Sequence, residues 1–160
     1  MKTLKVQTEK HQSSVTLRLF GDIDEDASFQ DIEIGKGKEV IIDMSGVDHI
    51  NSHGSRQWIK WAHSIPATVP IKVINCGPIF LDYVNMIHGF LPTQGHVESF
   101  KVPYYCESCG TVTFKTYQSK DISTPVRDII PIMDCPKCSS TAEMDVISPN
   151  FFKFLEKSKK

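Results

Sequence analysis

Four of the five cysteines in the chain are spaced as ligands for a single metal ion. They form two C-x-x-C pairs, Cys106 with Cys109 and Cys135 with Cys138, and 25 residues separate the pairs. A two-residue spacer lets both thiolates of a tight turn point at one ion, and two such turns complete a tetrahedron. Because four thiolates close the shell, no position remains open for water. We therefore predict a structural Zn²⁺ site without hydrolytic chemistry, with iron as the alternative.

The segment around these pairs resembles a zinc ribbon. The C-E-S-C-G and C-P-K-C turns carry the resemblance, which covers about residues 103–148. The turns are also similar to those of the rubredoxin iron site, but Ser139 stands where that pattern has its second glycine, so zinc is favoured over iron. Extended runs at 111–117, 129–133 and 142–146 predict a three-stranded sheet. A piece of this size with few large apolar residues needs the ion in order to fold.

A second group of chemically active residues lies near position 50. Ser52 and His53 lie at the start of an expected helix, and Asp24 and Asp43 come after two strand-like runs. Such residues raise the question of a hydrolase, but Ser52 and His53 are adjacent, and a catalytic triad needs groups from separate segments. The chain also has no G-x-S-x-G, G-x-G-x-x-G or Walker motif. We therefore expect a protein that is not an enzyme.

The residues from Val40 to Gly54 resemble the STAS domain, the fold of bacterial anti-sigma factor antagonists. The resemblance rests on a buried strand that runs into D-M-S-G-V and, after a short turn, on a polar cluster that ends in glycine at a helix start. L-F-G-D-I-D at 19–24 is similar to a second pattern of that family. The order of strands and helices agrees to about residue 102. The resemblance implies a bacterial regulatory protein of signal transduction, whose 51–55 loop and following helix bind an anti-sigma factor or a histidine-kinase-like ATPase.

The sequence departs from the family pattern at the position that matters for regulation. In the antagonists a serine directly before the glycine is phosphorylated, and the added charge breaks the complex with the partner kinase. Here Asn51 stands for the family aspartate, Ser52 for the first serine and His53 for the acceptor, and Ser55 replaces a leucine. The candidate partner and switch loop is therefore Asp24, Asn51, Ser52, His53 and Ser55. Ser52 or His53 is the candidate phosphorylation site.

Simpler roles stay open for the same residues. His53 is a contact residue in an unphosphorylated antagonist, a pH-sensitive or phosphorylatable group, or a surface residue at a helix start. Ser52 is either a phosphorylation site or the N-cap of the helix. Asp24 and Asp43, which the resemblance places at one end of the sheet, are either site residues or ordinary turn and strand-end carboxylates. Cys76, at the end of an expected strand, is interpreted as a small buried apolar residue.

Short strands that alternate with helices must position these groups. The run Val40–Ile42 predicts a strand buried on both faces in the middle of a sheet, and Gly21 is expected to end the strand before it. The expected strands are 4–7, 15–19, 40–42, 69–76 and 96–102, and the expected helices are 26–34, 52–65 and 77–88. This alternation predicts an α/β fold with a STAS-like sheet and packed helices over 1–102. The zinc ribbon over 103–148 and an amphipathic helix or tail over 149–160 follow it.

The apolar residues of the tail need a surface to cover them. STAS domains end in a helix packed on the sheet, but here the strand expected at 96–102 runs directly into the ribbon. Ser148 and Pro149 are expected to start a short helix instead. We hypothesise that its apolar residues either return to the vacant place on the first domain or form a face for a partner; they are Phe151, Phe152, Phe154 and Leu155.

Composition and charge narrow the class of partner. The 160 residues are 40% hydrophobic and 23% charged, as in soluble globular chains, and the formal net charge is −1. No run approaches the length of a membrane span, and the start of the chain does not build a signal peptide. We therefore expect a cytoplasmic protein that binds no membrane.

The charge of the ribbon argues against nucleic acid. From Pro103 onward 8 basic residues face 7 acidic ones, and four thiolates with one Zn²⁺ add a charge of about −2. A protein is therefore the expected partner. The alternative function is a zinc-ribbon adaptor that binds nucleic acid or a transcription complex. The oligomeric state stays open.

Overall fold

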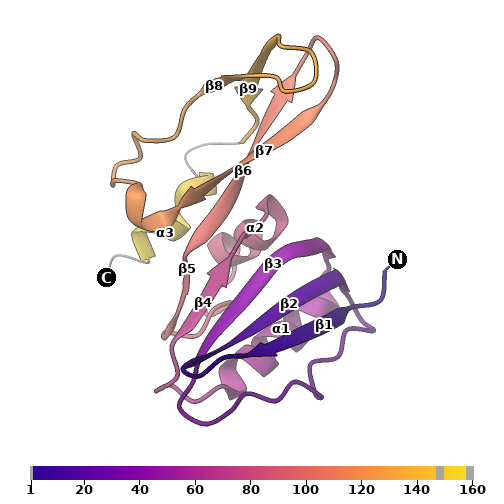
Figure 1. The fold of residues 1–160 in the computed structure, drawn as a ribbon, viewed down its shortest axis with the longest axis vertical. Coiled ribbons are helices and arrows are strands. Elements are labelled where there is room, and N and C mark those ends of the chain that lie inside the picture. The colour runs from indigo at the N-terminus through magenta and orange to yellow at the C-terminus, as the bar shows by residue number, and fades with distance from the viewer. Residues whose placement is uncertain (1, 147–149, 158–160) are drawn as a thin grey trace.

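The structure is a computed structural model that describes residues 2–146 and 150–157. Its N-terminal part is a five-stranded sheet, in which the strands lie side by side in chain order (Figure 1). The strands are β1 (Lys5–Lys10), β2 (Ser14–Ile23), β3 (Glu39–Ile50), β4 (Ile71–Ile74) and β5 (Gly95–Val97). β1 and β2 are antiparallel, and each neighbouring pair from β2 to β5 is parallel. Parallel neighbours need crossover connections.

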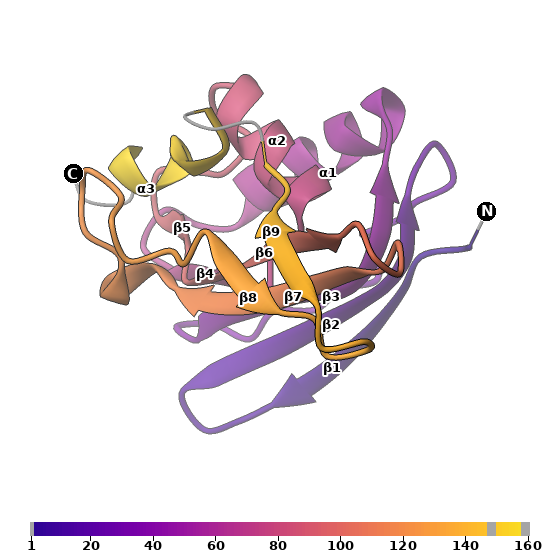
Figure 2. The same cartoon turned by 90° about the horizontal axis from the view of Figure 1, so that it is seen from above.

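Two helices make two of these crossovers. α1 (Ser52–Ser64) joins β3 to β4, and α2 (Pro78–Met86) joins β4 to β5. Figure 2 shows both helices on the same side of the sheet. Helix α1 has its fully buried Trp58 in the core, where the indole N–H donates to the carbonyl of Phe90 at 3.0 Å. The sheet with its crossover helices confirms the expected α/β class.

The core lies between the sheet and the helices. Along β2 and β3 buried and accessible residues alternate, and the buried ones are Val15, Leu17, Leu19, Val40, Ile42 and Met44. The place of β3 in the middle of the sheet is as expected. Its burial on both faces is not, because Ile41 and Asp43 between the buried residues are partly accessible. Both crossover helices lie on one side of the sheet (Figure 2), and no helix of the described residues covers the other face, so only alternate side chains are buried.

Strand β6 (Ser99–Cys106) connects the first sheet to a second one. Its start lies along Cys76, whose amide donates to the Ser99 carbonyl at 3.1 Å and whose carbonyl accepts from the Lys101 amide at 2.9 Å. β6 is also an inner strand of the second sheet, whose four antiparallel strands have the order β7-β6-β9-β8. The other strands are β7 (Val112–Gln118), β8 (Ile132–Asp134) and β9 (Thr141–Met144), and the 3₁₀ turn η1 (Ser119–Asp121) follows β7.

The ribbon therefore has four strands instead of the three expected from the sequence. The fourth is β6, because the strand expected at 96–102 is two strands, β5 and β6, which belong to different sheets. The division into domains at residue 102 stays a prediction, and β6 crosses that position without a break.

The C-terminal segment packs back onto the first part of the molecule. It consists of a 3₁₀ turn, η2 (Asn150–Phe152), and one helical turn, α3 (Phe154–Lys157). The four apolar residues of the segment are buried, and the rings of Phe154 and Phe100 meet edge to face with centroids 5.0 Å apart. The side-chain amide of Asn85 on α2 donates to the Phe151 carbonyl at 3.0 Å. The structure thus favours the docking hypothesis, whereas Ser148 and Pro149 lie outside the described residues.

Two further expectations for the N-terminal part are wrong. Residues 26–34 form no helix but an irregular crossover from β2 to β3. Phe29 anchors this crossover by stacking on Trp61 of α1, with ring centroids 5.2 Å apart, so the segment buries its apolar side without the cost of nucleating a short helix. Gly21 does not end β2, which continues to Ile23. Its positive φ of 105° instead lets the strand pass close to the carbonyl of Thr3.

Across the described ranges 2–146 and 150–157, no helix is long and apolar enough to span a membrane.

Docking of the C-terminal segment can be tested with Phe154→Ala. Because Phe154 is 1% exposed, the free energy of unfolding should fall by about 3 kcal/mol. Met86→Ala on α2 is the control, because Met86 is 71% exposed and its truncation should cost about 0.5 kcal/mol or less. Urea denaturation of both full-length variants measures the difference. Equal losses would contradict docking.

Candidate functional site

The four cysteines of the two C-x-x-C pairs meet at one point of the second sheet. Their sulfur atoms all lie within 4.8 Å of one another. Cys106 Sγ is 3.5 Å from Cys138 Sγ, and Cys109 Sγ is 3.6 Å from Cys135 Sγ. Zn–S bonds of about 2.3 Å in a tetrahedron separate the sulfurs by about 3.8 Å. The sulfur positions therefore fit a tetrahedral Zn²⁺, and the sequence expectation that these four residues form one site agrees with the geometry.

The two cysteine turns share one backbone geometry. In the first, the Gly110 amide donates to the Cys106 carbonyl at 2.8 Å, and in the second the Ser139 amide donates to the Cys135 carbonyl at 2.9 Å. Gly110 and Ser139 both adopt a left-handed conformation, with φ of 71° and 64°. The serine thus takes the conformation that glycine adopts without strain, and the second turn keeps its shape although the second glycine of the pattern is missing.

The sheet brings the two turns together. Cys106 is the last residue of β6 and pairs with Ala142 of β9, and Cys135 follows β8 directly. Two hydroxyl groups stabilise this arrangement, that of Thr111 beside Cys109 and that of Tyr104 on the buried face of the sheet. The Thr111 hydroxyl, 3.2 Å from Cys109 Sγ, lowers the pKa of that thiol to about 6, which favours the thiolate that binds metal. The Tyr104 hydroxyl donates to the Ile130 carbonyl at 2.7 Å and so holds the long loop before β8.

The fifth thiol takes no part in this site. Cys76 is fully buried, and its burial, together with the nearby Asp43 carboxylate, raises the pKa of the thiol. It is the small buried apolar residue that the sequence suggested.

The second candidate site, the 51–55 loop, begins with a helix cap. Asn51 is the N-cap of α1, and its side-chain oxygen accepts from the Gly54 amide at 2.8 Å. Ser52, which the sequence offered as a possible cap, is instead the first residue of the helix and is exposed. The cap position therefore shifts by one residue, because asparagine is at least as good an N-cap as serine.

The start of α1 lies directly against the end of β2. The Asn51 amide donates to the Ile23 carbonyl at 3.1 Å, and a Cβ on Gly54 would collide with the same carbonyl. Ser55 is buried, with its hydroxyl bonded to the Ser52 carbonyl at 2.8 Å. Asp24 is also buried and accepts from the Asp26 amide at 3.0 Å. Ser55 and Asp24 therefore hold the loop in place, and the exposed side chains at its tip are Ser52 and His53.

Glu25 joins this loop, although nothing in the sequence singled it out. The Asn51 side-chain amide donates to Glu25 Oε2 at 2.6 Å. Backbone hydrogen bonding, this amide and the nearby His53 and His49 together lower the pKa of the Glu25 carboxyl. Asn51 thus serves as helix cap and carboxylate donor at once. An aspartate, which the family pattern has here, would face Glu25 with like charge.

Asp43 does not flank this loop, in contrast to the expectation. The expected turn after D-M-S-G-V is absent, because β3 continues to Ile50 and places Asp43 within the strand, seven residues before its end. There Asp43 accepts from the Asn75 side chain and from the Ser45 amide, both at 3.0 Å. These bonds outweigh the effect of burial and lower the pKa of the Asp43 carboxyl.

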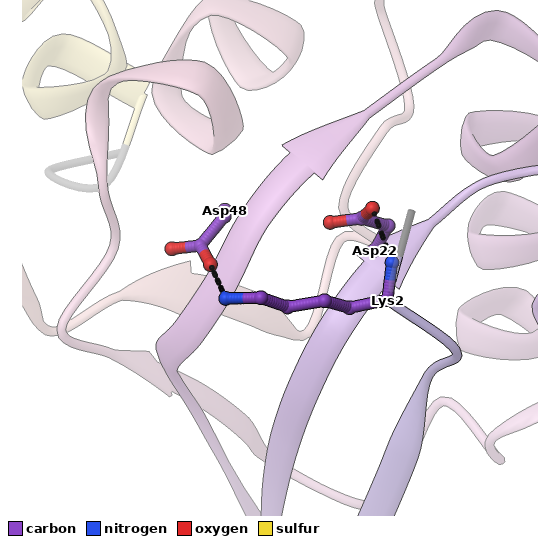
Figure 3. Close-up of polar contacts among 3 residues, drawn as sticks. All are labelled: Lys2, Asp22 and Asp48. Atoms are coloured by element: carbon purple, nitrogen blue, oxygen red, sulfur yellow. Dashed lines mark hydrogen bonds and ion pairs between the residues drawn. The ribbon is translucent and has the colours of Figure 1, made fainter.

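Lys2, the first described residue, contacts the last parts of β2 and β3, the two strands that lead toward Asp24 and the 51–55 loop (Figure 3). The Lys2 backbone amide donates to Asp22 Oδ2 at 3.0 Å, and Lys2 Nζ lies 3.3 Å from Asp48 Oδ2. Asp48 belongs to the last part of β3, two residues before its end. The sequence holds no local signal for these contacts, because 20 and 46 residues separate the partners.

Six chains of solved structures match this chain, and the first of them covers only part of it. That first structure is described as an uncharacterized protein from the DUF3478 family with a SpoIIAA-like fold, from Shewanella loihica PV-4. The two chains are 12% identical, the TM-score is 0.42, and the match covers 61% of this chain and 86% of the other. No protein-family model matches the chain, and no curated protein matches its sequence.

The double role of Asn51 can be tested with Asn51→Asp. The variant keeps an acceptor for the Gly54 amide but replaces the donor to Glu25 with a carboxylate, so the pKa of Glu25 should rise from its lowered value. NMR titration of the Glu25 side chain measures it. An unchanged pKa of Glu25 would contradict the role assigned to the Asn51 amide.

The free energy of unfolding should depend on pH through the same protonation of Glu25. A lowered pKa in the folded state stabilises the protein above the ordinary carboxyl range, and this contribution is lost as the pH falls through the folded pKa. Asn51→Asp should therefore be less stable than the wild type at neutral pH, and the difference should shrink as the carboxyl groups become protonated. Asn51→Ser, which keeps the cap without a charge, is the control for the loss of the amide alone.

Proposed function

We propose that this chain is a non-enzymatic regulatory protein that binds a protein partner through the tip of the 51–55 loop and the outer face of α1, and that the second sheet is folded around a structural Zn²⁺. The observation that carries the proposal is the fixed, exposed pair Ser52 and His53 at the start of α1. The STAS resemblance of residues 40–54 assigns a partner interface to the same loop.

The rigidity of the loop supports a binding role. Asn51 and Ser55 use their side chains inside the loop, and Gly54 lies against the β2 backbone. A tip that is ordered before binding loses little conformational freedom in a complex. Beyond the tip, α1 exposes the polar residues Arg56, Gln57 and Lys60, which extend the polar surface along the helix.

Charge at the tip supports its use as a switch. A phosphoryl group on Ser52 or His53 would add a charge of about −1.5 to −2 beside the Glu25 carboxylate. It would therefore repel Glu25 and any acidic group of a partner, although the N-terminus of α1 itself favours an anion. By the resemblance, the partner is an anti-sigma factor or a histidine-kinase-like ATPase.

The metal has a structural role in this proposal. Four thiolates complete the shell of a Zn²⁺, which leaves no position for substrate or water. Cys106 and Cys135 are buried, whereas Cys138 is exposed. The ion neutralises part of the thiolate charge and ties β6 to the turn that precedes β9. Iron stays the alternative ion.

Partner binding can be tested with His53→Glu in the full-length protein. The immobilised protein is exposed to an extract of the cells that express it, and mass spectrometry identifies what is retained. Retention of the partner should fall about tenfold or more, because a charge is placed at the centre of the interface. His88→Glu, the same change at another exposed histidine, should retain the partner. Equal retention by both variants, or retention of nucleic acid in place of protein, would contradict the proposal.

The metal assignment can be tested by elemental analysis of protein purified without added metal. One zinc per chain is expected, and chelation should greatly speed hydrogen exchange at Tyr104 and Ala142 while Val40 and Ile42 stay protected. Cys138→Ser should lose the zinc, whereas Cys76→Ala should keep it. One iron per chain and a red colour would overturn zinc, and no metal at all would overturn the site.

A further inference from the structure

The outer face of the second sheet carries a row of side chains across all four strands. Tyr105 of β6 pairs with Val112 of β7 and with Glu143 of β9, and Glu143 pairs in turn with Ile132 of β8. Residues directly opposite each other in a sheet point to the same face. Phe114, two residues after Val112, points to this face as well. We call these five residues the ribbon face.

The ribbon face is open, whereas the other face of the sheet is buried. Tyr105, Val112, Phe114 and Ile132 are 41%, 46%, 51% and 54% exposed. On the other face, Tyr104 and Ala142 are 0% and 1% exposed. Among the described residues seven large apolar side chains are exposed, and four of them, Tyr105, Val112, Phe114 and Ile132, belong to the strands of this sheet. Such a concentration of exposed apolar side chains on one small sheet marks an interaction surface.

A notch at one end of the ribbon face supplies a specific chemistry. It has a volume of about 380 Å³ and is lined by Tyr105, Glu107, Ser108, Ser140, Thr141 and Glu143. An aromatic ring with two carboxylates and three hydroxyl groups suits a cationic side chain, which the ring attracts over its face and the carboxylates bind as ions. Neither Glu107 nor Glu143 has an ion pair within the described part of the chain.

Charge around the notch favours the same kind of ligand. Asp134 lies on the same face, in the register next to Ile132, and the zinc–thiolate centre behind the sheet carries about −2. The basic residues on the strands and cysteine turns of this sheet are Lys137 on the second turn, Lys101 at the far end of β6, and Lys115 of β7, which the register places on the opposite face. The electrostatic potential at the notch is therefore negative, which disfavours the binding of phosphates and favours the binding of a basic segment.

We propose that the ribbon face is a second binding surface, which takes an extended segment of a protein partner with alternating apolar and basic residues. The apolar side chains of that segment cover Val112, Phe114 and Ile132, and an arginine or lysine side chain enters the notch between Tyr105, Glu107 and Glu143. The surface is separate from the 51–55 loop, so it adds a contact that the proposed function does not include.

The test is an NMR titration of the zinc-loaded, full-length chain with short peptides. One peptide has capped ends and alternates valine and arginine, and a second has glutamate in place of arginine. A short oligothymidine is the third probe. The arginine peptide alone should shift the amide signals of Tyr105, Val112 and Glu143. The double variant Glu107→Gln, Glu143→Gln should bind it about tenfold more weakly.

A matched variant controls for net charge. Asp31→Asn with Glu33→Gln removes two exposed carboxylates from the crossover between β2 and β3 and should bind the arginine peptide as the wild type does. The proposal is overturned if this control weakens binding equally, if the glutamate peptide or the oligothymidine occupies the face, or if no shift occurs. Concentration-dependent doubling of mass that Phe114→Ser abolishes would assign the face to a second copy and overturn the proposal too. His53→Glu should leave the titration unchanged, which separates this test from that of the loop.

Discussion

Strand β6 is the constraint on which both parts of the molecule depend. Its first residues bind the backbone on both sides of Cys76, its Phe100 ring contacts Phe154 of the C-terminal segment, and its last residue, Cys106, belongs to the four-cysteine cluster. The core of the first sheet and the sulfur cluster are thus held by one continuous backbone. The C-terminal segment packs against both α2 and β6. The two parts are therefore joined by apolar packing as well as by the continuous backbone of β6. The ribbon is therefore an extension of the first sheet's hydrophobic core and not an appendage on a flexible tether.

Several features were predictable because a single local pattern determines them. The β-branched run Val40–Ile42 lies in the central strand, and the apolar stripe around Trp58 lies on a helix in the core. Cysteine spacing is the strongest of these signals, since the geometry of metal coordination leaves few other arrangements for two C-x-x-C turns. Pairing of the turns by β6 and β9 follows a long-range register that spacing alone does not contain.

Other features depend on contacts that no local pattern records. Phe29 stacks on Trp61 more than thirty positions further along the chain, so an irregular segment takes the place of the expected helix. The predicted boundary at residue 102 lies directly before Pro103, and a proline cannot donate a hydrogen bond to a neighbouring strand. In β6, however, its carbonyl accepts from the Asp145 amide just beyond the end of β9, and the missing amide falls where the regular ladder to β9 has already ended. The bond from Asn51 to Glu25 likewise joins residues 26 positions apart, so no local pattern indicates that Glu25 belongs to the loop.

The close approach of α1 to β2 at Gly54 has a mechanical consequence. With no side chain between the helix backbone and the Ile23 carbonyl, the first turn of α1 cannot move inward, and an outward movement would break the amide bond of Asn51 to that carbonyl. The first turn of α1 is therefore held rigidly against the end of β2. A change of charge or size at Ser52 or His53 would therefore alter the surface potential and shape at that point without moving the backbone beneath it. Substitutions at the exposed positions Ser52 and His53 can therefore change the chemistry of this surface without a change in the packing of the core.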